Sequence, residues 1–330
     1  MLYYIDKNTN PYFNLAAEEY LFRQKEEPIF RLWRNEPAVI IGQYQNAFAE
    51  IHKDFIEENH IPVVRRLSGG GAVFHDTGNI NFTFIDQKKK GEDTAMMFKR
   101  FTRPIIEALK KLDVNAYLEG RNDLLIDNKK FSGNAIAVYK NRVLQHGTLL
   151  FSSSITNLNK ALNTRPEKFV GKAVKSNISR VTNISEHLSG THVNMTPEEF
   201  MQFLYKFIAN TSKLVDYTEE DLIKINKLRK NKYETYEWIW GKSPKYQYSN
   251  SIKLPCGFIE TYLNIEKGQI KTCRIMGDYF FLKPTEDISK ALIECPIKSS
   301  EIKNRLSKFN LKDYFGQDIL KELTKLLSVA

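Results

Sequence analysis

Three consecutive glycines that follow an expected β-strand constrain this fold more than any other feature of the chain. Residues 63–67 are expected to form a β-strand, and the segment Ser68-Gly69-Gly70-Gly71 follows at once. Three glycines in a row lose much conformational entropy on folding, so they are expected where backbone must approach another group closely. Their N–H groups can face phosphate oxygens without obstruction by a Cβ atom. A flexible turn is the simpler alternative.

Charged and polar residues flank the glycines on both sides. Arg65 and Arg66 precede them, and His75 and Asp76 follow shortly after. Arginine forms charge-assisted hydrogen bonds with anions, so these flanks favour phosphate binding over a flexible turn. The segment lacks the Gly-Lys-Ser/Thr ending of a Walker A loop, and the Rossmann pattern Gly-x-Gly-x-x-Gly fails at its last glycine. The sequence therefore predicts an anion site of a different type.

A second group of polar segments lies between residues 120 and 150. Lys130 opens an expected strand rich in small residues, where a ligand can lie against the backbone, although a solvated lysine is the common alternative. Asp123 can offer a carboxylate oxygen to Mg²⁺ or can cap a turn. For His75 and His146, the residues alone favour structural histidines held by hydrogen bonds.

The length of the chain and a change in its pattern of expected helices and strands predict two domains. The chain has 330 residues, more than one compact domain usually holds. The texture changes near residue 241, beyond which two strands, 257–265 and 269–276, and then two helices are expected. We therefore expect an α+β fold in which a large mixed-sheet domain, residues 1–246, precedes a small α+β domain, residues 247–330. Strands and helices of the first part do not alternate regularly, which argues against a doubly wound parallel sheet.

Composition excludes several classes of protein. Hydrophobic residues are 42% and charged residues 27%, as in ordinary globular proteins, and no apolar run could span a bilayer. The first residues lack the features of an export signal, so a cytoplasmic location is expected. Six basic residues and one acidic residue between positions 160 and 180 give half of the net charge of +10. This cluster suits a phosphate-bearing ligand, an acidic partner or a solvated loop. Motifs typical of nucleic-acid binding are absent.

Three segments, taken together in chain order, resemble the lipoate–protein ligase family of the biotin/lipoyl ligase and transferase superfamily. They are residues 65–79, 120–135 and 145–150. The segment that begins with Asn10 and Pro11 is similar to the first helix of the family. The resemblance covers essentially the whole chain. It implies a catalytic large domain of the biotin/lipoyl ligase type followed by a C-terminal accessory domain.

The resemblance implies an ATP-dependent reaction in two steps. Lipoate and Mg·ATP give lipoyl-AMP and pyrophosphate, and a carrier-domain lysine then attacks the mixed anhydride and releases AMP. The implied partners are lipoyl carrier domains, namely E2 subunits of 2-oxoacid dehydrogenases and the H protein of glycine cleavage, with no nucleic acid and no membrane. Such carriers are commonly acidic in this family, so the positive charge is expected to speed docking. An association rate independent of ionic strength would contradict this expectation.

The resemblance also implies which residues form the site. Lys130 is the implied catalytic residue, in contact with both the lipoyl carbonyl and the phosphate. The residues implied for ATP and the adenylate are Arg66, Gly71, Ala72, Val73, Phe74, Asn79, Asp123, Lys130 and His146. Those implied for lipoate are Ser68, Gly70, His75 and Lys130. Asp123 is the candidate magnesium ligand, and residues 171–180 are similar to a mobile loop that closes on the nucleotide.

An acyl chain needs a dry apolar slot, which gives about 0.8 kcal/mol for each buried methylene. By strand alternation the candidate lining residues are Val64, Val73, Phe82 and Phe84. They serve equally well as plain core.

Cysteine placement separates the enzymes of the superfamily. Its octanoyl transferases and lipoyl amidotransferases use a cysteine nucleophile and form a thioester. Here Cys256, Cys273 and Cys295 all lie in the expected accessory domain, so the sequence favours activation by ATP. A biotin ligase is disfavoured because residues 65–71 replace its adenylate loop. An acyl transferase remains the alternative enzyme, and a nucleotide or nucleic-acid binder is the alternative outside enzymes.

Overall fold

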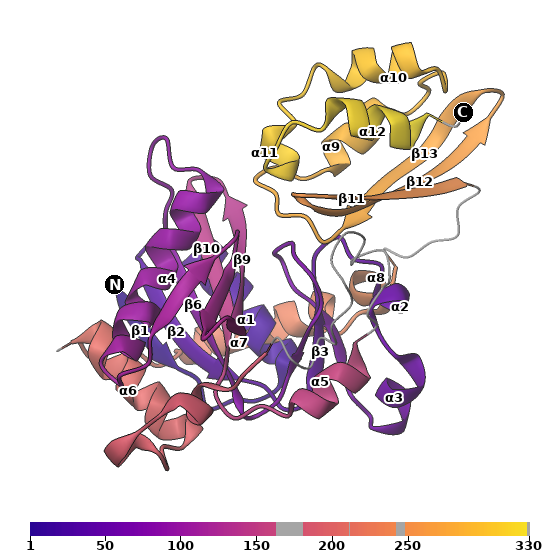
Figure 1. Ribbon diagram of the computed structural model, residues 1–330. Coiled ribbons are helices and arrows are strands. Elements are labelled where there is room, and N and C mark those ends of the chain that lie inside the picture. The colour runs from indigo at the N-terminus through magenta and orange to yellow at the C-terminus, as the bar shows by residue number, and fades with distance from the viewer. Residues whose placement is uncertain (163–180, 211, 242–247, 329–330) are drawn as a thin grey trace.

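The computed structural model of this protein describes residues 1–162, 181–210, 212–241 and 248–328. Figure 1 shows a large lower domain and a small domain placed above it. The expected boundary at residues 246 and 247 and the expected loop 171–180 lie outside the described residues. No described helix is long and apolar enough to cross a membrane.

The helices and strands of the large domain begin with β1 (Leu2–Ile5), α1 (Pro11–Gln24), β2 (Ile29–Arg34), β3 (Ala38–Ile41), α2 (Ala47–Glu50), α3 (Lys53–Glu58), β4 (Val63–Arg65), β5 (Val73–His75), β6 (Asn79–Gln87) and α4 (Thr94–Lys110). They continue with β7 (Ala116–Glu119), β8 (Asp123–Ile126), β9 (Lys129–Tyr139), β10 (Arg142–Leu150), α5 (Ile155–Ala161), α6 (Pro197–Ala209), α7 (Glu219–Leu228) and α8 (Tyr236–Ile239). The small domain contains β11 (Tyr248–Leu254), β12 (Gly257–Glu266), β13 (Gln269–Gly277), α9 (Glu286–Ala291), α10 (Ser299–Leu306), α11 (Lys312–Phe315) and α12 (Leu320–Leu327).

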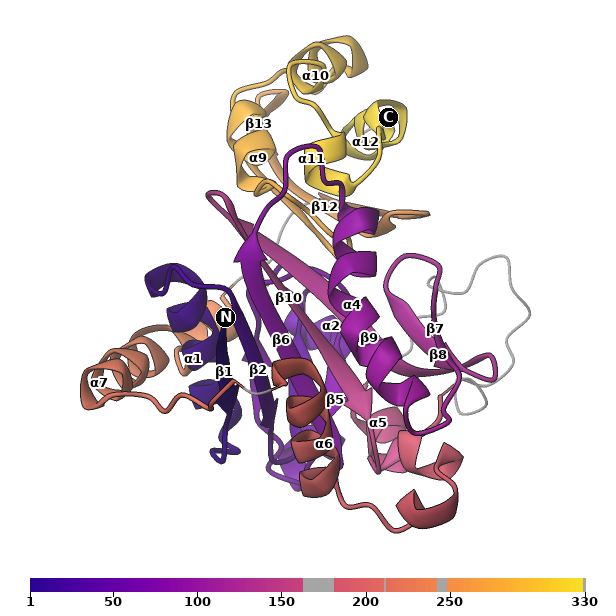
Figure 2. The same ribbon diagram turned by 90° about the vertical axis from the view of Figure 1, so that its left-hand side faces the viewer.

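A seven-stranded mixed sheet organises the large domain, in the order β1-β2-β6-β10-β9-β8-β7. Strands β1 and β2 are parallel and the other neighbours are antiparallel. This confirms the expected α+β class with a mixed sheet. Helices α4 and α6 cover one face, which Figure 2 shows towards the viewer. Helix α1 packs against the other face, so the sheet separates two environments.

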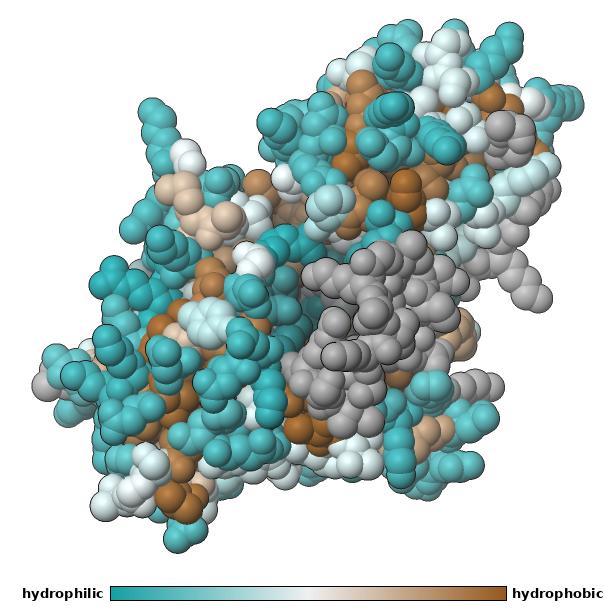
Figure 3. Space-filling model, in the orientation of Figure 1, coloured by the Kyte–Doolittle hydropathy of each residue, from teal (hydrophilic) through white to brown (hydrophobic). Residues whose placement is uncertain are grey.

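Strand alternation divides the side chains between these two faces. Phe30, Phe82 and Phe84 belong to the apolar cluster beneath α4 and α6, so they are plain core rather than pocket lining. The intervening residues of β6, Asn81 and Thr83, point to the face that α1 covers. On the surface seen in Figure 3, hydrophilic residues dominate and apolar residues form smaller groups between them. The buried polar side chains of β6 therefore lie on the face of the sheet that α1 covers.

The glycine turn connects the two edge strands of a second, three-stranded sheet, ordered β4-β3-β5. Strand β3 is parallel to β4 and antiparallel to β5. Because β4 and β5 lie on opposite sides of β3, residues 66–72 must cross the end of that strand. This crossing holds the three glycines beside the sheet face that α1 covers.

The small domain departs from expectation in two ways. Its sheet has a third strand, β11, and the two expected helices are four helical segments. Strand β11 is mostly exposed and polar, so it carries little of the alternation by which strands are recognised. Gly316 takes a left-handed φ of 73° at the end of α11, which separates it from α12.

In the large domain, the sequence did not predict strand β7, an edge strand of only four residues.

The small domain rests directly on the glycine turn. The Gly70 N–H donates to the Tyr279 carbonyl at 3.4 Å, and the Gly277 N–H donates to the Tyr44 carbonyl at 2.9 Å. The ring of Tyr44 stacks on that of Tyr279, with 5.7 Å between centroids. Because the Gly69 α-carbon lies against the Tyr279 carbonyl, this contact has no room for a side chain.

We predict that Gly69→Ala loosens the docking of the two domains. The added Cβ would overlap the Tyr279 carbonyl oxygen, and neither backbone can yield without moving the interface. Overpacking costs ~1–3 kcal/mol, so the undocked population is expected to rise about tenfold. Small-angle scattering and the rate of tryptic cleavage between the domains measure this.

Gly71→Ala is the matched control, because a Cβ there meets nothing within 4 Å. Equal compactness and equal cleavage rates for both variants would contradict the predicted role of Gly69.

Candidate active site

Two connected hollows lie beside the glycine turn. The inner pocket has a volume of about 130 Å³ and lies on the sheet face towards α1. Its lining includes Trp33, Arg66, Gly70, His75, Asn81, Lys130 and His146. The outer cleft is larger, about 780 Å³, and opens between the glycine turn and strands β8 and β9. Its lining includes Gly71, Ala72, Val73, Phe74, Arg121, Asp123 and Lys130.

Lys130 stands where the two hollows meet, and it lines both. Its Nζ lies 2.8 Å from Oδ1 of Asp123, and its side chain runs across Gly133, where a Cβ would be 3.2 Å from Nζ. Among the described residues it is the one charged side chain that lines both spaces. A single ammonium can thus contact a carbonyl in the inner pocket and a phosphate in the outer cleft.

Arg66 shapes the glycine turn from within. Its guanidinium donates to the carbonyls of Ile40, Gly69 and Gly71 and to the hydroxyl of Ser68, at 2.7–3.1 Å. Burial lowers its pKa to about 10, so it stays charged at neutral pH. Because much of its hydrogen-bonding capacity is directed to the turn itself, Arg66 holds the bare backbone N–H groups in place beside the pocket.

Arg65, directly before the turn, braces the loop after β3 and the end of α8. It donates to the carbonyls of Gly42, Gln45 and Ile239, among others, and burial lowers its pKa to about 9. The paired arginines that suggested an anion site therefore act first as internal supports. Arg66 lines the inner pocket, whereas Arg65 lines neither hollow.

His146 is fixed by partners on both ring nitrogens. Nε2 lies 2.6 Å from Oγ of Ser68, and Nδ1 lies 2.8 Å from Oε2 of Glu18. Burial alone would raise the pKa of Glu18, but the charge and hydrogen bond of His146 and the hydroxyl of Thr83 hold it below its usual value. The serine is fully buried and lines neither hollow, so this Ser–His–Glu row orients the pocket wall and exposes no nucleophile.

His75 lines the inner pocket as a neutral ring. Burial, together with the positive charges of the nearby Arg66 and His146, lowers its pKa to about 3. Its Nδ1 lies 3.0 Å from Nδ2 of Asn35. Both histidines thus combine the structural role expected from sequence with a place at the pocket.

The predicted site residues are not all equally close to the hollows. Arg66, Gly70, Gly71, Ala72, Val73, His75, His146 and Lys130 line the inner pocket, and Phe74 and Asp123 line the outer cleft. Ser68 and Asn79 line neither. Asn79 is fully buried and donates to the Asn81 side chain at 3.0 Å. Their contribution is to support residues that do reach the pocket.

Other lining residues were missed. Trp33 and Asn81 are paired across β2 and β6, and polar alternation along residues 79–83 was the signal that could have found the second. Phe280 of the small domain also lines the inner pocket, and its distance along the chain hid it. The described residues contain no cluster of three or more side chains suited to hold a metal ion.

A small pocket and a wider cleft that share one lysine are consistent with an enzyme that joins an acid to a nucleotide, and comparison with known protein families identifies the class. The model of the lipoyl protein ligase A/B catalytic domain matches residues 10–209. The model of the bacterial lipoate protein ligase C-terminus matches residues 243–327. The chain belongs to the lipoate–protein ligase family.

Curated relatives and solved structures agree with this family. Lipoate-protein ligase LplJ of Bacillus subtilis is 42% identical, and the match covers 98% of each chain. Lipoate–protein ligase 1 of Staphylococcus aureus is 39% identical, over 97% of each. P. falciparum LipL1, solved in complex with lipoate, has a TM-score of 0.80 at 27% identity and 98% coverage of each chain.

Two further structures match about three quarters of this chain. A lipoate-protein ligase A bound with ATP has a TM-score of 0.63 at 26% identity, covering 73% of this chain and 100% of that one. The bipartite lipoate protein ligase of Thermoplasma acidophilum, described with its E2 lipoyl domain, has a TM-score of 0.65 at 28% identity, covering 75% and 98%.

The buried neutral state of His75 predicts a pH dependence of stability. Its pKa falls from 6.5 in the unfolded chain to about 3 in the folded one. Between these values the unfolded chain binds one more proton, so stability falls as the pH falls. We predict that His75→Asn reduces the slope of unfolding free energy against pH by up to ~1.4 kcal/mol per pH unit between pH 6 and 4. Urea unfolding at each pH measures it.

His52→Asn, at an exposed position, serves as the control. Identical slopes for the wild type and His75→Asn would show that His75 does not stay neutral in the folded protein.

Proposed function

We propose that this chain activates lipoate with ATP as lipoyl-AMP and then transfers the lipoyl group to a lysine of a lipoyl carrier domain. The observation that carries the proposal is the position of Lys130, whose side chain lines both the inner pocket and the outer cleft. The acid would occupy the inner pocket with its carboxylate at Lys130, and the nucleotide would occupy the outer cleft. We assign residues 1–246 to catalysis and residues 247–330 to the accessory domain.

The named relatives support the choice of substrates. Lipoate is bound in one structural neighbour, and ATP is bound in another, which is named lipoate-protein ligase A. A third is described with its E2 lipoyl domain. We therefore propose E2 subunits of 2-oxoacid dehydrogenases and the glycine cleavage H protein as acceptors, met in the cytoplasm.

The first step joins two anions, so its barrier is largely electrostatic. A carboxylate oxygen of lipoate attacks the α-phosphorus, and the bond from that phosphorus to pyrophosphate breaks. Lys130 offsets the repulsion between the carboxylate and the phosphate. Gly71 and Ala72 line both hollows, so their backbone N–H groups would be close enough to bind the phosphate, with only small side chains beside them.

The second step uses the same cation again. The amine of the carrier lysine attacks the acyl carbonyl, the bond from the carbonyl carbon to the AMP oxygen breaks, and the amine loses a proton to water. Negative charge grows on the carbonyl oxygen during the attack, and a fixed ammonium at Lys130 stabilises it. The inner pocket is lined more by apolar than by polar surface, which would limit the access of water to the anhydride until the carrier lysine arrives.

Magnesium fits this site only in a limited way. Asp123 lines the outer cleft and offers one carboxylate, which is already paired with Lys130. Mg²⁺ is commonly bound by one or two carboxylates together with substrate phosphates. We propose that Asp123 would be the protein ligand of a Mg²⁺ ion bound mainly by the phosphates of ATP, and that this ion would supply positive charge against the phosphates.

Replacing Lys130 is the direct test. Lys130→Ala removes the one charged group shared by the two hollows, so lipoate-dependent exchange between pyrophosphate and ATP is expected to fall by ~10²–10³. Transfer to a lipoyl domain, measured by mass spectrometry, is expected to fall at least as much.

Lys129→Ala is the matched control, because Lys129 is the exposed neighbour on the same strand and lines neither hollow. Exchange that needs no lipoate, or an active Lys130→Ala variant, would refute the proposed function.

The cysteines provide a second test, against the thioester route. Burial raises the pKa of Cys256 to about 11 and that of Cys273 to about 12, and it raises the pKa of Cys295 as well. Buried, protonated thiols make poor nucleophiles. We predict that iodoacetamide leaves the activity of the native protein unchanged and that no acyl-cysteine forms. Acyl transfer without ATP, together with an acylated cysteine, would instead favour the transferase.

A further inference from the structure

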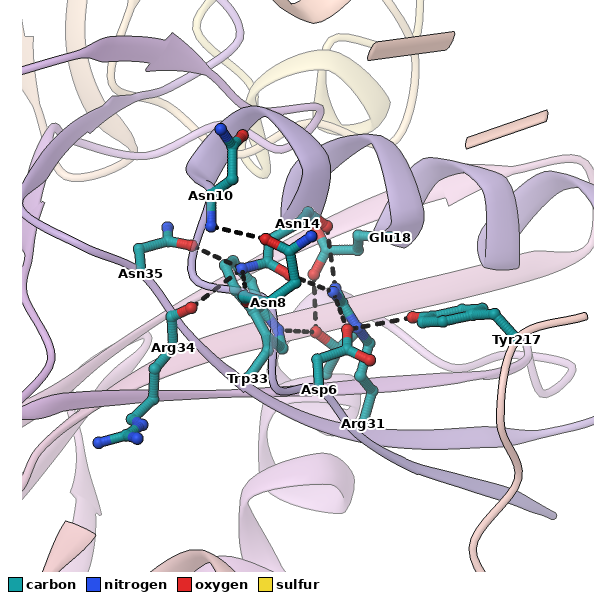
Figure 4. A network of polar contacts seen from close by, with 11 residues as sticks. Asp6, Asn8, Asn10, Asn14, Glu18, Arg31, Trp33, Arg34, Asn35 and Tyr217 are labelled. Carbon is teal, nitrogen blue, oxygen red and sulfur yellow. Dashed lines mark hydrogen bonds and ion pairs between the residues drawn. The ribbon is translucent and has the colours of Figure 1, made fainter. Parts of the chain in front are cut away.

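A buried row of polar side chains leads from the edge of the large sheet to the inner pocket. Arg31, fully buried, pairs with Asp6 and donates through Nη2 to Oδ1 of Asn14 at 2.9 Å. Nδ2 of Asn14 donates to Oδ1 of Asn35 at 2.9 Å, and Nδ2 of Asn35 lies 3.0 Å from Nδ1 of His75. Figure 4 shows this row as far as Asn35.

The direction of every hydrogen bond in the row follows from its first member. A guanidinium only donates, so the atom of Asn14 that faces Arg31 must be its oxygen. The nitrogen of the same amide also donates to the carbonyls of Asn8 and Arg34, which independently settles its orientation. The oxygen of Asn35 must then face Asn14, and its nitrogen must face His75. Nδ1 of His75 is therefore an acceptor.

A neutral histidine that accepts at Nδ1 carries its proton on Nε2. The charged or titratable groups that face this ring are Arg66 and His146, and with burial they keep it neutral. Within the described residues, Nε2 has no hydrogen-bond partner, and His75 lines the inner pocket. The wall of the pocket thus presents an N–H donor.

Asn81 brings a second donor to the same wall. Its Oδ1 accepts from Asn79, which turns its Nδ2 away from that residue. The side chain is 2% exposed, it lines the inner pocket, and Nδ2 has no partner among the described residues. A buried donor without a partner is uncommon in folded proteins and needs an acceptor from elsewhere.

The sheet places these donors at the end of the pocket remote from Lys130. Gly133, beneath the lysine, donates to Oγ1 of Thr148 on the next strand. Thr148 pairs with Asn81, and Asn81 pairs with Trp33. Neighbouring strands are about 4.8 Å apart, so Asn81 lies about 10 Å from Gly133, close to the extended length of an eight-carbon acid. The ring of His75 meets that of Trp33 edge to face, 6.0 Å between centroids.

We propose that His75 and Asn81 are specificity-determining donors that select an acid with a hydrogen-bond acceptor at its far end. This inference rests on the proposed function, which sets the carboxylate at Lys130. A ring containing sulfur offers acceptors there, although weak ones, whereas a plain alkyl chain leaves both donors unpaired. Asn35 and Asn14 are positioning residues, because they fix which nitrogen of His75 carries the proton. The site prefers lipoate to octanoate for this reason and not for ring shape alone.

The sharpest probe is 5-cyclopentylpentanoic acid, which has the shape of lipoic acid with both sulfurs replaced by methylenes. Calorimetry with the full-length protein is expected to show that lipoate binds about tenfold tighter than this analogue, a difference of 1.4 kcal/mol. Equal affinity would overturn the inference. Lipoate-dependent exchange of pyrophosphate with ATP, run in parallel, tests the proposed function separately, because binding is measured without turnover.

Asn35→Asp reverses the polarity of the row while keeping its size. The new carboxylate accepts at both oxygens, so His75 must donate from Nδ1 and offer a lone pair from Nε2 to the pocket. We expect the preference for lipoate over the analogue to disappear at pH 9 and to return at lower pH, where the ring becomes doubly protonated. In the wild type the preference stays constant from pH 6 to 9. A purely structural role of Asn35 would not produce this pH profile.

Two further measurements complete the test. Asn10→Asp is the matched control, because Asn10 caps α1 and lies outside the row, and it is expected to keep the wild-type preference. The ¹⁵N chemical shifts of His75 are expected to report a proton on Nε2 in the wild type and on Nδ1 in Asn35→Asp at pH 9. A wild-type proton on Nδ1 would overturn the inference whatever the binding data show.

Discussion

The glycine turn can be held open only because a buried guanidinium supplies the hydrogen bonds that side chains would otherwise provide. Arg66 donates to carbonyls on both sides of the turn and to Ser68, and Arg65 ties the turn to Gly42 and to the end of α8. A charge this deeply buried is stable only when its donors are satisfied. The shape of the pocket, the seat of the small domain and the support of His146 all depend on this arrangement.

The two faces of the large sheet have different roles. Phenylalanines on one face build the core with α4 and α6, and polar residues on the other face build the pocket beneath α1. Lys130 enters from the edge of the pocket, where small residues of β9 let its side chain cross the strand. The acid and the nucleotide would therefore meet at a residue fixed by sheet geometry, which is more rigid than a loop.

The motif residues and the α+β class could be predicted from sequence, because glycine runs and paired charges are local patterns. The alternation of side chains along the strand predicts that Phe82 and Phe84 share one face of the sheet, but it does not predict which face binds the ligand. Only the structure shows that both residues are buried in the core. Glu18 and Trp33 were missed because nothing local relates them to His146 and Asn81. Phe280 could not be expected at the pocket, since the docking of a second domain leaves no periodic signal.

The separation of the two faces has a consequence for how such an enzyme can change during evolution. Trp33 and Asn81 line the ligand cavity and lie outside the aromatic cluster on the reverse side, so a substitution at either position alters the cavity with little effect on the packing of that cluster. Single substitutions in the pocket can therefore allow a different acid to bind with only a small loss in the free energy of unfolding. Because one sheet separates the core from the pocket, substrate specificity can change during evolution while the stability of the fold is maintained.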